Sequence, residues 1–315
     1  MSGSAVRVAA VDCGTNSLRL LVADVDPVAG TLTDLERLME IVRLGEGVDR
    51  TGRLSDAALE RTFRVCDAYA ARIAALGAQR VRFVATSASR DAENAAQFVA
   101  GVRERFGVDA EVVSGDEEAA LSFAGATREL VGRAAPPYLV VDIGGGSTEL
   151  VLGDGAPVAA RSVDVGCVRI TERRLHSDPP TAAEVAAARA DIAAAVELAG
   201  ATVPLRAART VVGLAGSVTT LAAMDAELPA YDETVTHHYR LPAESVHRLT
   251  ARLLGMTRAQ RALVPVMHPG RVDVIAAGAL VLEAVVDATG CSEVLVSEHD
   301  ILDGIAWSLA ESPAS

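Results

Sequence analysis

The stretch Tyr138-Leu-Val-Val-Asp-Ile-Gly-Gly-Gly-Ser-Thr-Glu-Leu-Val-Leu152 decides the fold. An apolar run ends at Asp142, three glycines follow, and a second apolar run with β-branched residues begins after Ser147. This pattern predicts a strand, a tight turn and a second strand. Consecutive glycines let the backbone approach a ligand closely and direct several N–H groups toward it, so the turn suits an anionic phosphate group.

Two carboxylates, Asp142 and Glu149, flank this loop. A hard divalent cation such as Mg²⁺ prefers oxygen ligands and could lie between these carboxylates and a phosphate. A glycine-rich hairpin with chance carboxylates explains the same segment, because a single glycine-rich turn is a weak motif. The segment alone therefore leaves both interpretations open.

A second copy of the pattern near the N-terminus favours the functional interpretation. The stretch Val6-Arg-Val-Ala-Ala-Val-Asp-Cys-Gly-Thr-Asn-Ser-Leu-Arg-Leu-Leu-Val22 has the same order of apolar runs, carboxylate, glycine and serine. The matching residues are Asp12, Gly14 and Ser17 in the first copy and Asp142, Gly144 and Ser147 in the second. Such self-similarity predicts two homologous halves. We expect each half to open with a phosphate loop and the two loops to face each other across a cleft.

Composition limits the classes of function. The chain of 315 residues is long for one domain and sufficient for two, and its 50% apolar content can bury their cores. A net charge of −13 argues against broad nucleic-acid or anionic-membrane binding, so local arginines would have to hold a polyanion. All 29 basic residues are arginines. A lysine nucleophile and a Walker-type NTPase site are therefore excluded.

The cysteines and the N-terminus indicate where the protein acts. Cys13, Cys66, Cys167 and Cys291 show no C-x-x-C spacing, so neither a zinc site nor a disulfide framework is predicted, and Cys13 is expected to pack rather than to react. The N-terminus has no cleavage-site pattern, and no apolar stretch reaches membrane-spanning length. We therefore expect a cytoplasmic protein.

Periodicity and capping residues predict an alternation of strands and helices. Further strands are expected at 81–86, 110–113, 158–164, 210–214 and 293–296, and helices at 55–77, 94–105, 114–130, from 181, from 242, at 272–289 and at 301–309.

Charged residues at the starts of helices in the first half are candidates for catalysis. Arg90 follows the strand at 81–86, where ligands commonly bind in α/β sheets, although a solvated surface arginine fits equally well. Glu117 and Glu118 fall in the first turn of a helix, where the helix dipole by itself explains acidic residues. The functional interpretation needs only one of them, placed to accept a proton from water.

The second half contains further candidates. Arg169, Arg173 and Arg174 could hold a polyanion or form a solvated helix face. The small-residue turn Ala215-Gly-Ser-Val-Thr-Thr220 at a helix N-terminus suits an anion.

The histidines give no metal-binding pattern. His237 and His238 have no carboxylate at ligand spacing, so no metal site is expected there. The dipeptide His299-Asp300 lacks the upstream histidine pair of HD-type phosphohydrolases.

Four motifs together resemble the exopolyphosphatase/guanosine pentaphosphate phosphatase family. They are Asp12-Cys-Gly-Thr-Asn-Ser17, Ser114-Gly-Asp-Glu-Glu-Ala119, Asp142-Ile-Gly-Gly-Gly-Ser-Thr-Glu149 and Ala215-Gly-Ser-Val-Thr219, in the family's order. The chain is most similar to the short, two-domain actinobacterial members. The resemblance implies an α/β fold of two ribonuclease-H-like domains of the actin-like type, with an interdomain active-site cleft. The expected domains are 1–122 with the C-terminal helix 299–315, and 123–298.

The resemblance also implies roles for individual residues. Glu118 matches the catalytic base, Arg90 a phosphate-binding arginine, and Asp142 and Glu149 the acidic residues around Mg²⁺, with Mn²⁺ as a possible substitute. The residues in the implied phosphate loops are Asn16, Ser17, Gly144, Gly145, Gly146, Ser147, Gly216, Ser217 and Thr219. The helical C-terminal extension of the long members is absent, which argues against the tight dimer and the grip on very long chains of those relatives. A monomer or a homodimer is expected.

The implied activity is Mg²⁺-dependent removal of the terminal phosphate of inorganic polyphosphate, processive or distributive, by water that Glu118 activates. One alternative is hydrolysis of the 5′ γ-phosphate of guanosine pentaphosphate, which the 3% aromatic content weakly disfavours. A small-molecule kinase and a non-catalytic sensor of polyphosphate or alarmone are alternatives of other classes. No nucleic-acid or membrane partner is expected.

Overall fold

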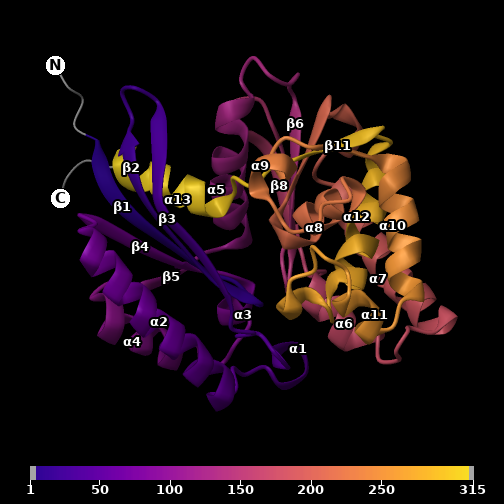
Figure 1. Cartoon of the computed structure of the whole chain (residues 1–315), viewed down its shortest axis with the longest axis horizontal. Helices are drawn as coiled ribbons and strands as arrows, with labels where there is room; N and C mark the ends of the chain where they lie inside the picture. The colour runs from indigo at the N-terminus through magenta and orange to yellow at the C-terminus, as the bar shows by residue number, and fades with distance from the viewer. Residues whose placement is uncertain (1–4, 312–315) are drawn as a thin grey trace. The chain divides into compact units, whose positions relative to one another are not determined.

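A computed structural model describes residues 5–311 and shows two compact units, which we treat one at a time (Figure 1). Unit 1 takes the chain up to Gly125 and again from Ile301, and unit 2 runs from Ala126 to Asp300. The boundaries expected from the sequence were 122/123 and 298/299. Each unit is built on one mixed β-sheet, which is the predicted α/β class.

The sheet of unit 1 has the strand order β3-β2-β1-β4-β5. β1 pairs antiparallel with β2, β2 pairs antiparallel with β3, and β1, β4 and β5 run parallel. The strands are β1 (Val6–Cys13), β2 (Ser17–Asp26), β3 (Thr31–Ile41), β4 (Arg80–Ala85) and β5 (Ala110–Val112). The strands predicted at 81–86 and 110–113 are thus present.

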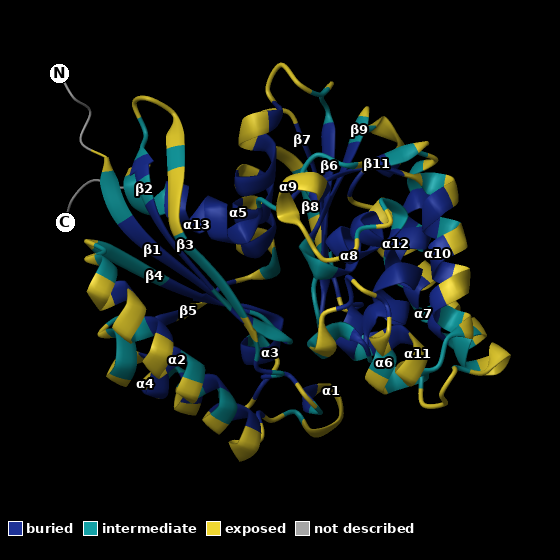
Figure 2. Cartoon of the chain, viewed as in Figure 1, coloured by how far each residue is buried: buried dark blue, intermediate teal, exposed yellow. Residues whose placement is uncertain are grey.

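Helices cover both faces of this sheet. Ala9 and Val11 of β1 belong to a core that α2 and α4 complete, whereas Val8 and Ala10 point to the opposite core, which α13 completes. Figures 1 and 2 show α13, from the C-terminal end of the chain, largely buried beside β1 and β2. The helices of unit 1 are α1 (Val48–Thr51), α2 (Asp56–Leu76), α3 (Ser87–Arg90), α4 (Ala95–Phe106), α5 (Gly115–Thr127), which ends just beyond the boundary, and α13 (Ile301–Glu311).

The capping residues place α2 where the sequence predicts it. The Ser55 side chain accepts a hydrogen bond from the Ala58 N–H at 3.2 Å, which satisfies a free donor of the first turn. At the other end, Gly77 adopts φ 70°, the left-handed conformation that ends many helices and that glycine adopts without steric cost.

The sheet of unit 2 has the strand order β10-β11-β9-β6-β7-β8. β6 pairs antiparallel with β7 and parallel with β9, as β1 does with β2 and β4. The strands are β6 (Tyr138–Ile143), β7 (Thr148–Gly153), β8 (Pro157–Val163), β9 (Thr210–Leu214), β10 (Arg240–Pro242) and β11 (Glu293–Val296). The order β8-β7-β6-β9-β11 therefore repeats β3-β2-β1-β4-β5, with β10 added at the edge, and the predicted internal repeat is confirmed.

A large hydrophobic core and the helices around it complete unit 2. A capping box begins α7 at the predicted position 181, because the Thr181 side chain accepts from the Glu184 N–H and the Glu184 side chain accepts from the Thr181 N–H. α12 is buried along most of its length, as Figure 2 shows, so its apolar sequence reflects a core position. The helices are α6 (Cys167–Arg174), α7 (Ala182–Gly200), α8 (Ala215–Asp225), α9 (Glu233–Thr236), α10 (Ala243–Gly255), α11 (Arg258–Ala262) and α12 (Ile275–Thr289), with short 3-10 turns η1 (Arg128–Leu130), η2 (Leu205–Ala207) and η3 (Pro269–Arg271).

The repeat extends to the turns themselves. In the first loop the Gly14 N–H donates to the Ser17 carbonyl at 3.0 Å, and in the second the Gly144 N–H donates to the Ser147 carbonyl, also at 3.0 Å. The two hairpins thus close with the same backbone bond. Within residues 5–311, no helix combines the length and the apolar character that crossing a bilayer requires.

Candidate active site

The structure brings Arg90 and Glu118 together within unit 1. The Arg90 Nη1 donates to a Glu118 carboxylate oxygen at 3.2 Å and to the Val113 carbonyl at 2.9 Å. Glu118 is 8% exposed, and the Arg90 side chain keeps 28% of its surface exposed. Only an ionised carboxylate forms such an ion pair, and the ionised form is the one that can accept a proton.

The structure distinguishes the two neighbouring glutamates of α5. Glu117 points outward, with a half-exposed side chain, and pairs with Arg82 at 2.7 Å. Its backbone N–H is capped by the Ser114 hydroxyl at 3.2 Å. Glu118, one residue along, turns its carboxylate inward to Arg90 because successive helical residues point about 100° apart. Of the two, Glu118 has the partly enclosed setting that suits a general base.

The first phosphate loop lies at the same edge of this sheet as α3. β1 and β4 run parallel, so the loop after β1 and the helix after β4 begin at one edge. The Thr15 and Ser87 hydroxyls are 2.8 Å apart, which joins the loop to α3 and so to Arg90. The Asn16 carbonyl accepts the N–H groups of Val42 and Arg43, so the loop is held in place. Asn16 and Ser17 are half-buried here.

In unit 2, Asp142 and Glu149 are direct partners across β6 and β7. Residues directly opposite in an antiparallel pair project from the same face of the sheet, so both carboxylates lie on one face. Asp142 is 8% exposed and Glu149 is 1% exposed. The Ser162 hydroxyl donates to Glu149 at 2.7 Å, which fixes the orientation of this carboxylate.

This pair fits a hard divalent cation. Two carboxylates on one face offer several oxygen donors next to a loop that suits phosphate, which is how proteins usually hold Mg²⁺. The repeat in unit 1 differs at this point, because Asp12 lies opposite Arg19 and pairs with it at 2.7 Å. The first hairpin thus pairs its carboxylate with an arginine, whereas the second places two carboxylates side by side.

The second phosphate loop is packed tightly against the start of α6. The carbonyls of Gly144 and Gly145 accept the N–H groups of Cys167 and Val168 at 3.0 and 2.9 Å. Gly166 lies so close that a Cβ added to it would be 2.5 Å from the Gly145 carbonyl oxygen, so glycine is required for this contact. The loop 144–147 is therefore held rigid by the backbone beside it.

Among the arginines of α6, the structure separates two roles. The Arg169 Nε donates to the Gly146 carbonyl at 2.7 Å and thus lies beside the second loop. Arg174 instead pairs with Asp191 of α7 at 2.7 Å, so the expectation that it helps to hold a polyanion is not supported by its contacts. This ion pair links α6 to α7.

The turn at the start of α8 lies next to the second loop. β6 and β9 are parallel, with Asp142 opposite Leu214, so the turn after β9 begins at the edge where the loop begins. Ser217 is packed against α12, where a Cβ on Gly278 would lie 2.1 Å from its hydroxyl oxygen. Ser217 also contacts the thiol of Cys167, whose pKa burial raises to about 11. Thr219 is buried.

Ala215 adopts φ 64°, a left-handed conformation that is uncommon outside glycine and is often found at functional turns. Because this turn directly follows β9, it places the start of α8 at the sheet edge that carries Gly144 to Ser147.

Arg271 is a candidate residue that the sequence analysis missed. Its guanidinium lies over Gly216, where a Cβ would be 2.1 Å from the guanidinium carbon, and its Nη1 donates to the Thr220 hydroxyl at 3.2 Å. This cation comes from η3, far from α8 in sequence. The feature of the sequence that pointed to this contact was Gly216, because the lack of a side chain there leaves room for the Arg271 guanidinium.

The fold places a carboxylate from a distant segment beside His237. Glu129, 108 residues away in sequence, lies with its Oε2 3.2 Å from the His237 Nε2. His299 also contacts Glu129, at 3.2 Å. Partial burial opposes the charged form of Glu129, but His299 and His237 together lower the pKa of this carboxyl.

Comparisons with known proteins agree with this set of motifs. Residues 21–312 match the model of the Ppx/GppA phosphatase family. The chain is 51% identical to Exopolyphosphatase 2 of Mycobacterium tuberculosis, over 96% of this chain and 98% of that protein. The crystal structure of an exopolyphosphatase-like protein is similar with a TM-score of 0.92 at 40% identity, covering 96% of this chain and 98% of that one. A structure of the Aquifex aeolicus PPX-GPPA enzyme has a TM-score of 0.80 at 30% identity, covering 96% and 99%.

These likenesses extend over nearly the whole chain and confirm the actin-like fold that the motifs implied. With its repeated hairpins and its four motifs in order, the chain belongs to the Ppx/GppA phosphatase family.

Proposed function

We propose that this protein is an exopolyphosphatase that hydrolyses the terminal phosphate of inorganic polyphosphate and releases orthophosphate. The observation that carries the proposal is the contact between Glu118 and Arg90, which pairs a partly enclosed carboxylate with a cation that keeps exposed surface. A base for water and a ligand for phosphate are what such a hydrolase needs. The 51% identical relative named Exopolyphosphatase 2 supports polyphosphate as the substrate.

In this proposal Glu118 accepts a proton from the attacking water. The water oxygen forms a bond to the terminal phosphorus, the bond from that phosphorus to the bridging oxygen breaks, and the bridging oxygen stays with the shortened chain. Arg90 neutralises the charge on the phosphate oxygens, as guanidinium groups do with their paired donors. One orthophosphate leaves in each cycle.

Asp142 and Glu149 would hold Mg²⁺, or Mn²⁺ in its place. When bound, such an ion polarises phosphoryl oxygens and offsets the charge that spreads over them. The Ser162 hydrogen bond keeps Glu149 oriented toward this role. The buried position of both carboxylates supports it, since two buried carboxylates on one face gain from a shared cation.

The backbone N–H groups of the second loop and of the first turn of α8 would bind phosphate oxygens. Both segments start at the same sheet edge in unit 2, and Arg271 adds a cation beside Gly216. Donors fixed before the substrate arrives stabilise developing charge without reorganisation. Asn16 and Ser17 would act in the same way from unit 1.

We propose that the protein acts in the cytoplasm. Cys13, Cys66, Cys167 and Cys291 are all free thiols, which is the usual state of cysteines in a reducing compartment.

The substrate assignment is tested by phosphate release from purified protein with Mg²⁺. Short polyphosphate, long polyphosphate, guanosine pentaphosphate and ATP are compared at equal concentrations of terminal phosphate. We expect polyphosphate to have the highest kcat/KM and EDTA to stop the reaction. A higher kcat/KM for guanosine pentaphosphate would replace the proposal by the alarmone phosphatase. Binding of polyphosphate without any release would indicate a sensor, and transfer of phosphate to a small acceptor would indicate a kinase.

Gly166→Ala tests the role of the second loop. The added Cβ would meet backbone atoms of Gly145, which can yield only by moving the loop. Because displacements of about 1 Å in a positioning element can cost ~10²-fold in rate, we expect phosphate release to fall by roughly 10- to 100-fold. Gly255→Ala is the matched control, since no atom lies within 4 Å of a Cβ built there. Equal activity of the two variants would show that the position of the second loop does not affect phosphate release.

A further inference from the structure

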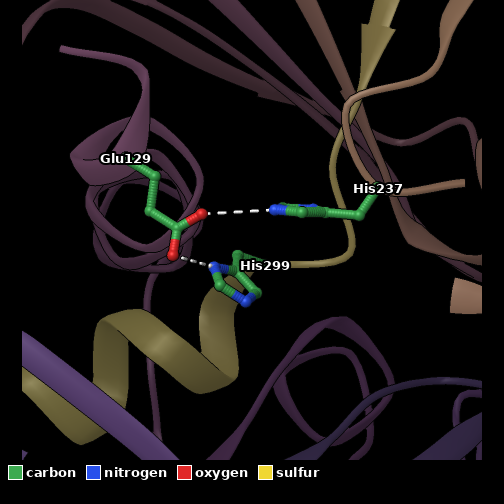
Figure 3. Close-up of side chains that lie close together, drawn as sticks. All are labelled: Glu129, His237 and His299. Atoms are coloured by element: carbon green, nitrogen blue, oxygen red, sulfur yellow. Dashed lines mark hydrogen bonds and ion pairs between the residues drawn. The ribbon is translucent and has the colours of Figure 1, made fainter. Parts of the chain in front are cut away.

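Three ligand-type side chains from separate segments converge within unit 2, as Figure 3 shows. Glu129 lies in η1, His237 directly follows α9, and His299 lies between β11 and α13. The Glu129 Oε2 is 3.2 Å from the His237 Nε2, and the Glu129 Oε1 is 3.2 Å from the His299 Nδ1. One ligand atom from each residue lies within 4.8 Å of the other two.

We propose that Glu129, His299 and one imidazole of the pair His237–His238 form a binding site for a transition-metal dication of the Zn²⁺ type. Imidazole nitrogen and carboxylate oxygen are the donors that Zn²⁺ binds together in proteins. With metal–ligand bonds of about 2.0–2.1 Å, neighbouring ligand atoms of a tetrahedron lie ~3.3 Å apart. Each histidine nitrogen lies 3.2 Å from a Glu129 oxygen, His237 from Oε2 and His299 from Oε1, so small side-chain shifts would bring one atom of each residue to that spacing.

The number of imidazoles favours a metal over a simple ion pair. The rings of His237 and His238 have centroids 3.8 Å apart, and those of His237 and His299 are 4.6 Å apart. The His238 Nε2 is also only 4.0 Å from the Glu129 Oε2. Three protonated rings would place three positive charges around one carboxylate and repel one another. Clustered neutral imidazoles beside a carboxylate are instead a common metal-ligand set.

The hydrogen bonding of His237 explains why the site involves a pair of histidines. The His237 Nδ1 accepts the Glu298 N–H at 3.2 Å, so a neutral ring carries its proton on Nε2 and donates it to Glu129. Binding a metal through this Nε2 would require the proton to move to Nδ1 and that hydrogen bond to break. His238 needs only a shift of its Nε2 toward the same carboxylate oxygen. Either ring can therefore supply the second nitrogen.

The position of the cluster in the chain indicates what the metal does. Glu129 lies close to the first residue of unit 2, Ala126, and His299 is the residue before its last, Asp300. A metal bound by both would join the two ends of this unit and fasten the loop after α9 to them. A metal that binds the folded chain and not the unfolded one stabilises the fold by its binding free energy. This inference does not depend on the proposed phosphatase reaction.

The test is a Zn²⁺ titration of the full-length, metal-stripped protein against a chromophoric chelator, in millimolar Mg²⁺ to occupy oxygen-only sites. We expect one Zn²⁺ per chain, a melting temperature several degrees higher with Zn²⁺, and visible absorption bands when Co²⁺ replaces it. Glu129→Gln, His299→Ala and the double variant H237A/H238A should each lose the stoichiometric binding and the thermal shift. Absence of stoichiometric binding in the wild-type protein would overturn the proposal.

Two control variants show whether the loss of Zn²⁺ binding is specific to this cluster. His176→Ala removes an exposed histidine of unit 2 outside the cluster and should bind Zn²⁺ as the wild type does. Asp142→Asn should also retain it, because the proposed Mg²⁺ ligands are a different donor set. Each cluster variant is required to match the metal-free wild type in circular dichroism and melting temperature. Wild-type Zn²⁺ affinity in a folded Glu129→Gln or His299→Ala variant would contradict the proposed ligands.

Discussion

Glu118→Gln is expected to lower the rate of phosphate release from polyphosphate by ~10²–10⁴-fold, the usual loss when a general base is removed. The amide has the size of the carboxylate and can still accept a hydrogen bond from Arg90, so the fold of unit 1 should persist. It cannot take up the proton of the attacking water. The loss should therefore appear in kcat, with polyphosphate binding largely retained, and is measured by steady-state release of orthophosphate.

The neighbouring residue provides a matched control for this variant. Glu117→Gln makes the same chemical change one position earlier on α5, at a side chain that points outward to Arg82. Exposed ion pairs of this kind contribute little, so activity should stay within about twofold of the wild type. If both variants keep wild-type kcat, Glu118 is not the base, and if both lose activity equally, the effect is a general one on α5.

Asp142→Asn is expected to have the second large effect. The variant removes one of the two facing carboxylates that we propose as Mg²⁺ ligands. A divalent ion contributes several kcal/mol to the stabilisation of a phosphoryl transition state, and each ~1.4 kcal/mol is a factor of ten in rate. We expect at least ~10²-fold slower release at fixed Mg²⁺, and a shift of half-maximal activity to higher Mg²⁺ concentration in a titration.

The control for this change lies on the same hairpin. Asp154 is exposed at the turn after β7, so Asp154→Asn removes an equal charge from the other end of the β6–β7 pair. It should leave both the rate and the Mg²⁺ dependence as they are in the wild type. An Asp142→Asn variant that responds to Mg²⁺ like the wild type would exclude Asp142 as a ligand.

The repeated hairpins could be predicted because their information is local. Apolar runs of strand length, broken by glycines at matched positions, determine both turns, and the same residues fix the register that places Asp142 opposite Glu149. The starts of α2, at Ser55, and of α7, at Thr181 and Glu184, could also be predicted, because a cap depends on residues within one turn.

Strand β3 could not be predicted in the same way. It forms the edge of the sheet of unit 1, and its residues are mostly exposed or half-buried, with charged side chains along it. Such a strand has no continuous apolar run, because one edge faces water and charges there discourage pairing with other chains. Its place is set by β2 rather than by its own pattern.

Contacts between segments that lie far apart in the chain could not be predicted from the sequence either. Arg271 reaches Gly216 from a separate 3-10 turn, and Glu129 meets His237 across 108 positions. The sequence likewise left Glu117 and Glu118 equivalent, because both suit the positive end of a helix. Their difference comes from partners on other strands and helices, Arg82 for one and Arg90 for the other.

The most direct test of the central claim follows the products of polyphosphate by gel electrophoresis while orthophosphate is measured in parallel. With Mg²⁺ and wild-type protein, the account predicts that orthophosphate is the only small product and that its amount equals the phosphate lost from the long chains. Fragments of intermediate length formed without matching orthophosphate would show internal cleavage. Those fragments, or unchanged polyphosphate under the same conditions, would contradict the assignment of an exopolyphosphatase.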